Sequence, residues 1–160
     1  MEERRKMNYI GVFDRLNDAK TNIHSFYQQL REQTLAASRG IVSREESKVE
    51  EKGKVEMILK SFEEFCYTCE EVLSMLKEDT KKIEEERIPE ELKKVLQNYA
   101  NALKDCRNYM EIVFKDPVFE FYSSKDTIYS LKSRLSSLEK GTKKLLYELS
   151  KKNSSVLLLK

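Results

Sequence analysis

Apolar side chains recur along most of this chain in alternating steps of three and four residues, with charged and polar residues between them. This spacing places the apolar residues on one side of an α-helix, and its heptad form is typical of coiled-coil packing. The four stripes are Tyr9, Val12, Leu16, Ala19, Ile23, Phe26 and Leu30; Val55, Leu59, Phe62, Cys66, Cys69, Leu73, Leu76, Thr80 and Ile83; Leu92, Leu96, Tyr99, Leu103, Cys106, Met110 and Val113; and Ile128, Leu131, Leu135, Leu138, Thr142, Leu145 and Leu149. The pattern predicts an all-α protein with three to four long helices. These would form an elongated antiparallel bundle or coiled coil.

Capping and helix-breaking residues divide the stripes into segments. Gly40 suits the C-terminal cap of a first helix, and Ser43 begins a Ser-x-x-Glu capping box for a second. Pro89 suits the first turn of a third helix, and Pro117 interrupts or kinks the pattern. We therefore expect helices at about 3–38, 44–86, 89–115 and 118–152 within a single domain, 1–160, that ends in an apolar tail at 154–160.

Three features of this pattern allow more than one interpretation. Gly53 lies inside the second helical segment, where it marks either a weak turn or the close approach of another helix. The third and fourth segments form either one long helix bent at Pro117 or two helices, the second of them capped by Ser123 or Ser124. The spacing also leaves open whether the stripes close within one chain or between two.

Composition narrows the class of protein further. Four glycines and two prolines supply too few turns for a β-sandwich or barrel. No run approaches the ~20 apolar residues needed to span a bilayer, and the N-terminus lacks the apolar segment of a secretory signal. Three cysteines, an odd number in a chain with an ample core, indicate a reducing compartment. We therefore expect an intracellular, cytoplasmic protein.

The net charge of +2 conceals an uneven distribution along the chain. Residues 42–86 carry a net charge of −6, whereas residues 117–160 carry +5. In the simpler interpretation, the acidic second helix lies beside the basic fourth one in a complementary bundle. In the sharper one, the bases of the fourth segment bind an anionic membrane surface or a partner, and each contributes ~1 kcal/mol at a membrane. These bases are Lys132, Arg134, Lys140, Lys143, Lys144, Lys151 and Lys152.

The last residues of the chain form an apolar tail. Its apolar members are Val156, Leu157, Leu158 and Leu159. Such a tail either folds back on the bundle, opens a further helix or contacts a partner.

The chain offers few groups for catalysis or metal binding. Cys66 and Cys69 have the C-x-x-C spacing of zinc and redox motifs, and Cys106 and His24 would complete four ligands. Both cysteines of the motif lie on an apolar stripe in the middle of a helix, which favours a buried core role. A di-iron bundle needs two Glu-x-x-His motifs, which a single histidine cannot supply. We expect no metal, no cofactor and no enzymatic activity. We also expect no nucleic-acid binding, because the aromatic residues follow the helical stripes.

The stretch over residues 109–152 resembles the middle helix of BAR domains of the sorting-nexin type. In that family a phenylalanine and a proline precede an acidic-aromatic step, and an apolar-Lys-x-x-apolar run leads into basic residues. The matching residues are Phe114, Pro117, Val118, Glu120, Phe121, Ile128, Leu131, Lys132, Arg134 and Leu135. Phe62, Phe65 and the Ile88-Pro89 break fit the family's first helix and turn more loosely, and Gly40 lies where that first helix would normally continue.

The resemblance implies a non-enzymatic, dimeric helical scaffold that binds curved anionic membranes in endosomal sorting and trafficking. The apolar stripes would form the dimer, the basic fourth segment would face the membrane, and the tail would open a shortened third helix. Such a protein would lie peripherally on the endosomal membrane. The alternative is a helical protein–protein adaptor or chaperone subunit, a homo- or hetero-dimer with no lipid activity.

Overall fold

A computed structural model of the protein describes residues 2–82 and 89–152. These residues form five α-helices and no strand, which confirms the all-α class. The helices are α1 (Glu2–Ser38), α2 (Arg44–Lys81), α3 (Glu90–Phe114), α4 (Pro117–Tyr122) and α5 (Lys125–Lys152). α2 ends before the predicted boundary at 86, and most of the predicted remainder lies outside the described residues. None of the described helices is long and apolar enough to cross a membrane.

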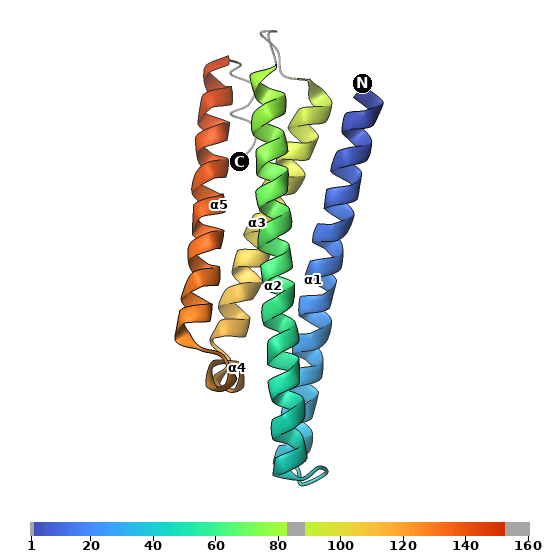
Figure 1. Ribbon diagram of the computed structural model, residues 1–160, viewed down its shortest axis with the longest axis vertical. Coiled ribbons are helices and arrows are strands. Elements are labelled where there is room, and N and C mark those ends of the chain that lie inside the picture. Colours follow the sequence, from blue (N-terminus) through green and yellow to red (C-terminus); the bar gives the residue numbers. More distant parts are fainter. Residues whose placement is uncertain (1, 83–88, 153–160) are drawn as a thin grey trace.

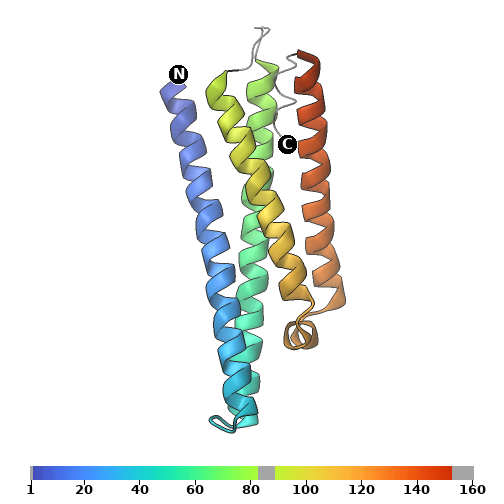
Figure 2. The same ribbon diagram turned by 180° about the vertical axis from the view of Figure 1, so that it is seen from behind.

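The four long helices form an elongated bundle in which each runs opposite to the one before it (Figure 1). α2 lies on one face between α1 and α5, and α3 crosses the opposite face, as Figure 2 shows from behind. α1 and α2 share the most extensive contact in the bundle, and α2 and α5 share the next. α2 and α5 therefore lie side by side and run in the same direction, which makes α2 the central helix.

The turn between α1 and α2 forms at the predicted residues. Gly40 has a φ of 73°, in the left-handed region that glycine adopts without steric cost. The N–H of Ile41 donates to the carbonyl of Ala36 at 2.9 Å, the long hydrogen bond of a Schellman cap. Ser43 Oγ then accepts a 3.2 Å hydrogen bond from the N–H of Glu46 and begins α2. The resulting hairpin extends beyond α4 at one end of the bundle (Figure 1).

The predicted apolar stripes face one another and form a continuous core. Every predicted position of the third stripe is buried, as is every position of the fourth except Ile128, which is half-buried. In the first stripe Tyr27 is buried in place of Phe26, which is half-buried. In the second stripe Leu59 is half-buried, and Ile83 lies outside the described residues. The stripes therefore close within a single chain.

α2 carries a second buried stripe that the heptad pattern did not reveal. Its members again follow steps of three and four: Ile58, Ser61, Phe65, Thr68 and Val72. The arrangement of the bundle explains this second stripe, because α2 has neighbours on more than one side (Figure 1). On one side Arg15 of α1 pairs with Glu71. On another, the Tyr99 hydroxyl of α3 donates to the Cys69 carbonyl at 3.2 Å.

The helix predicted over 118–152 is in fact two helices, and neither is continuous with α3. Pro117 has no N–H to donate and occupies the first turn of α4, whose N-cap is Asp116. α4 ends at Tyr122, and Ser124 Oγ accepts a 3.0 Å hydrogen bond from the N–H of Thr127 at the start of α5. The predicted local cap at Ser124 is therefore present, while the predicted unbroken helix is wrong.

Three glycines, Gly11, Gly53 and Gly141, lie inside helices, and only Gly141 marks a close contact. A Cβ added at Gly53 would meet nothing within 4 Å, so this residue marks neither a turn nor a helix contact. A Cβ added at Gly141 of α5 would lie 2.8 Å from Cδ2 of Leu73 on α2. The close helix approach considered at Gly53 occurs at Gly141 instead.

Candidate functional site

The basic residues predicted to meet an anionic surface lie along α5. The buried residues of this helix, from Leu131 to Leu149, face the core, so the basic side chains between them point elsewhere. The exposed members are Lys132, Lys140, Lys143, Lys144 and Lys151. The side chain of Lys152 and the tail residues Val156, Leu157, Leu158 and Leu159 lie outside the part of the chain whose side chains are described.

One further lysine extends this set. Lys125 is exposed at the first position of α5, and its spacing of seven residues from Lys132 could have identified it in the sequence. We call the resulting set the lysine stripe: Lys125, Lys132, Lys140, Lys143, Lys144 and Lys151. Helical geometry places these positions on the side of α5 that points away from the core. Lys132 lies at the edge of this side, and its Nζ is 5.9 Å from the ring centroid of Phe114. None of them forms an ion pair with an acid of residues 2–82 or 89–152.

Two tyrosines share the side of α5 that carries the lysine stripe. Tyr129 is 75% exposed and Tyr147 is 63% exposed. The ammonium group of Lys151 lies 4.7 Å from the ring centroid of Tyr147, within cation–π range. The outer side of α5 therefore combines unpaired positive charge with exposed aromatic rings.

Arg134 is held differently from the lysines. It is half-buried, and its Nη2 lies 2.6 Å from Oε1 of Glu70 on α2. This hydrogen bond raises the pKa of the guanidinium. Among the described residues it is the single ion pair between α2 and α5. The acidic and basic helices are thus neighbours, as the simpler interpretation expected, but the lysine stripe is not neutralised by α2.

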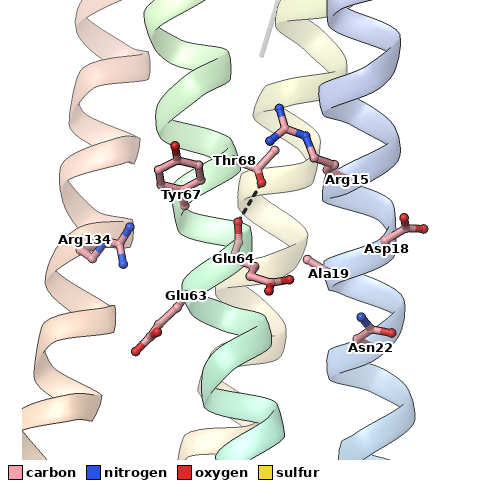
Figure 3. A pocket seen from close by; sticks show the side chains of 9 residues that line it. All are labelled: Arg15, Asp18, Ala19, Asn22, Glu63, Glu64, Tyr67, Thr68 and Arg134. Carbon is pink, nitrogen blue, oxygen red and sulfur yellow. Dashed lines mark hydrogen bonds between the residues drawn. The ribbon is translucent and has the colours of Figure 1, made fainter.

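A shallow depression of about 690 Å³ crosses the exposed side of α2 between α1 and α5 (Figure 3). Its lining residues are Arg15, Asp18, Ala19, Asn22, Glu63, Glu64, Tyr67, Thr68 and Arg134. Both arginines are engaged by glutamates of α2, Arg15 by Glu71 and Arg134 by Glu70. The hydroxyl of Thr68 donates to the Glu64 carbonyl at 2.8 Å. Among these lining residues, no nucleophile is paired with a base.

The three cysteines are packing residues of the core. Cys66, Cys69 and Cys106 are buried and free. Burial raises the pKa of Cys66 to about 11 and raises the pKa values of the other two thiols as well. Protonated thiols are poor nucleophiles and poor metal ligands. Within residues 2–82 and 89–152, no group of three His, Cys, Asp or Glu side chains is placed to hold a metal ion.

His24 contributes to the contact between α1 and α3. Its ring lies against the ring of Tyr109, with the centroids 3.7 Å apart and the planes inclined by 35°. Burial, followed by the positive charge of Lys20, lowers the pKa of His24. The helix contact therefore disfavours protonation of the imidazole.

Comparison with known proteins adds no relative to this picture. No family model, no curated protein and no solved structure matches this chain. The case for a function rests on the surface of α5.

Proposed function

We propose that this protein is a non-enzymatic helical module that binds anionic membrane surfaces through the outer side of α5. The lysine stripe is the observation that carries this proposal. It consists of exposed lysines on one helix, and none of them is paired with an acid of the described residues. Positive charge and aromatic residues on one side of a helix are typical of peripheral binding to acidic lipids.

The lysine stripe can supply enough electrostatic attraction to hold the protein on an acidic leaflet. Each lysine close to an acidic leaflet contributes ~1 kcal/mol, so six together contribute about 6 kcal/mol before the cost of immobilising their side chains. α5 has 28 residues and is therefore about 42 Å long, and a straight helix of this length can place several lysines on one plane. The ion pair between Arg134 and Glu70 helps to hold α5 on the bundle while the lysines remain available.

The cysteines and the histidine add no arrangement for catalysis to this proposal. The cysteine thiols are kept protonated by burial, and His24 is used in a helix contact. Neither feature provides the activated nucleophile or positioned base that catalysis would need.

The resemblance to sorting-nexin BAR domains would extend this proposal to a dimer that prefers curved membranes and lies on endosomes. We propose instead that a single copy binds, and the core supports this form because the apolar stripes close on one another within one chain. Electrostatic attraction to a flat acidic bilayer needs neither a dimer nor curvature.

Vesicle sedimentation tests the proposal. The protein should pellet with phosphatidylcholine vesicles that contain phosphatidylserine and stay in solution with vesicles of phosphatidylcholine alone. Added salt should release it, because exposed charges are screened over a Debye length of ~8 Å at physiological ionic strength. Equal failure to pellet with both kinds of vesicle would refute the proposal.

A second candidate function is that of a protein–protein adaptor, which the depression on α2 favours. Tyr67 is 58% exposed there, and Glu63 and Glu64 lie beside it (Figure 3). Neither carboxylate forms an ion pair within residues 2–82 and 89–152. An exposed aromatic ring with an acidic border suits the core and rim of a contact with a basic helix. In that case Tyr67→Ala would weaken capture of the partner and leave vesicle sedimentation unchanged.

A further inference from the structure

Phe121 is held on the outside of the short helix α4. Phe119 is fully buried, and its ring is stacked on that of Phe114 with the centroids 5.1 Å apart. Two residues further along a helix correspond to a rotation of about 200°, which directs Phe121 away from this packed side. Phe121 is 77% exposed, more than any other large apolar side chain of the described residues.

The corner that carries Phe121 is firmly anchored. Asp116 caps α4 by accepting a 2.9 Å hydrogen bond from the N–H of Val118. At the other end, the hydroxyl of Ser123 donates to the Phe119 carbonyl at 2.7 Å. α4 also packs against both α2 and α3. Phe121 therefore cannot reach the core without breaking these contacts.

The lysine stripe begins directly after this corner. Lys125 is four residues beyond Phe121, and Tyr129 follows one helical turn later on the outer side of α5. Lys115, at the end of α3, is exposed just before α4. Exposed aromatic residues next to lysines are a common composition where proteins contact the interfacial region of a membrane.

We propose that this corner is the point at which the protein enters the membrane interface, with Phe121 as an apolar anchor and Tyr129 beside it. The inference rests on the proposed function and adds to it an orientation, because the beginning of α5 would lie deeper than its end. An acidic bilayer suits this surface better than an apolar partner protein. At the corner itself the exposed acids Glu120 and Asp126 offset Lys115 and Lys125, so the complementary charge comes from the rest of the lysine stripe along α5, while the ring finds hydrocarbon below it.

A single tryptophan at the corner provides the test. The chain contains no tryptophan, so Phe121→Trp places the sole indole at the predicted anchor. Addition of phosphatidylserine-containing vesicles should shift its emission to shorter wavelength, and brominated lipids in those vesicles should quench it. Tyr67→Trp, on the exposed side of α2, is the matched control and should show neither effect.

A binding measurement gives a second readout. Phe121→Ser should lower the partition coefficient on the same vesicles by about tenfold, since most of the transfer free energy of one aromatic ring is lost. Ile10→Ser on α1 removes an exposed apolar side chain elsewhere and should leave partitioning unchanged.

The two proposals fail in different ways. If the wild-type protein does not sediment with acidic vesicles, the proposed function and this inference both fall. If it sediments while the emission of Phe121→Trp stays unshifted and unquenched, the corner is not an anchor, although α5 still binds. A shift produced by a protein partner rather than by vesicles would also overturn the inference.

Discussion

The hydroxyl of Tyr27 donates a 2.9 Å hydrogen bond to Oδ2 of Asp116, which joins α1 to the N-cap of α4 across 89 residues of chain. The other carboxylate oxygen of Asp116 accepts from the N–H of Val118 at 2.9 Å. Arg31 of α1 lies 3.6 Å from Oδ2 and adds an opposite charge. One largely buried carboxylate thus has two roles. It caps α4, and it links α1 to the corner of the bundle on which Phe121 lies.

Asp116→Ala should lower the free energy of unfolding by about 2 kcal/mol. Loss of an N-cap costs ~1 kcal/mol, and loss of the hydrogen bond from Tyr27 to a charged acceptor costs about as much again. Asp18→Ala, which removes an exposed acid of α1, should change stability by less than about 0.5 kcal/mol. Urea unfolding followed by circular dichroism measures both, and similar losses in the two variants would contradict the role of Asp116.

Two of the helical glycines, Gly53 and Gly141, should respond differently to alanine. Gly53→Ala should stabilise the protein by about 0.5–1 kcal/mol, because alanine favours the helix and its Cβ meets open space. Gly141→Ala should give no such gain, because its Cβ would lie 2.8 Å from Cδ2 of Leu73 and the leucine would have to move. Thermal or urea unfolding compares the two, and equal stabilisation would show that α5 and α2 do not approach as closely as described.

Stability should fall in mildly acidic solution because of His24. Its pKa in the folded protein is lowered from the usual 6.5 by burial and then by Lys20, so the unfolded chain binds the proton more tightly. The contribution of His24 is therefore fully present above about pH 6.5, and it is lost as the pH falls through 6.5 toward the lower folded pKa.

His24→Gln is the control for this dependence. Histidine is the one side chain whose ordinary pKa titrates between about pH 5 and 8, and His24 is the only histidine of the chain. The free energy of unfolding of the variant should vary less across this range than that of the wild type. Identical slopes would show that another group is responsible.

Much of the fold follows from apolar spacing, and the exceptions have physical causes. The stripe from Leu131 to Leu149 is buried as predicted, because a heptad repeat places its apolar residues on one side of a helix. The second stripe of α2, which includes Phe65, does not follow from the heptad pattern, because spacing alone does not reveal how many neighbours a helix has. The short helix α4 cannot be separated from α5 by spacing, because six residues are too few to show a repeat.

The candidate site was predictable to a similar extent. The exposure of Lys140 and Lys143 follows from their positions opposite the apolar stripe. The pairing of Arg134 with Glu70 could not be predicted, because it depends on α2 being the neighbour of α5. The exposure of Phe121 could not be predicted from the sequence either, because it depends on Phe119 occupying the buried position of α4.

Charge reversal on two helices tests the central claim most directly. Lys140→Glu combined with Lys143→Glu alters the lysine stripe, and Lys52→Glu combined with Lys60→Glu makes the same change in net charge at exposed sites of α2. The measurement is the partition coefficient of each variant on phosphatidylserine-containing vesicles. The α5 variant should bind at least about tenfold more weakly than wild type, because each reversal removes ~1 kcal/mol of attraction and adds repulsion. The α2 variant should stay within about twofold. Equal weakening of the two variants would contradict binding through α5.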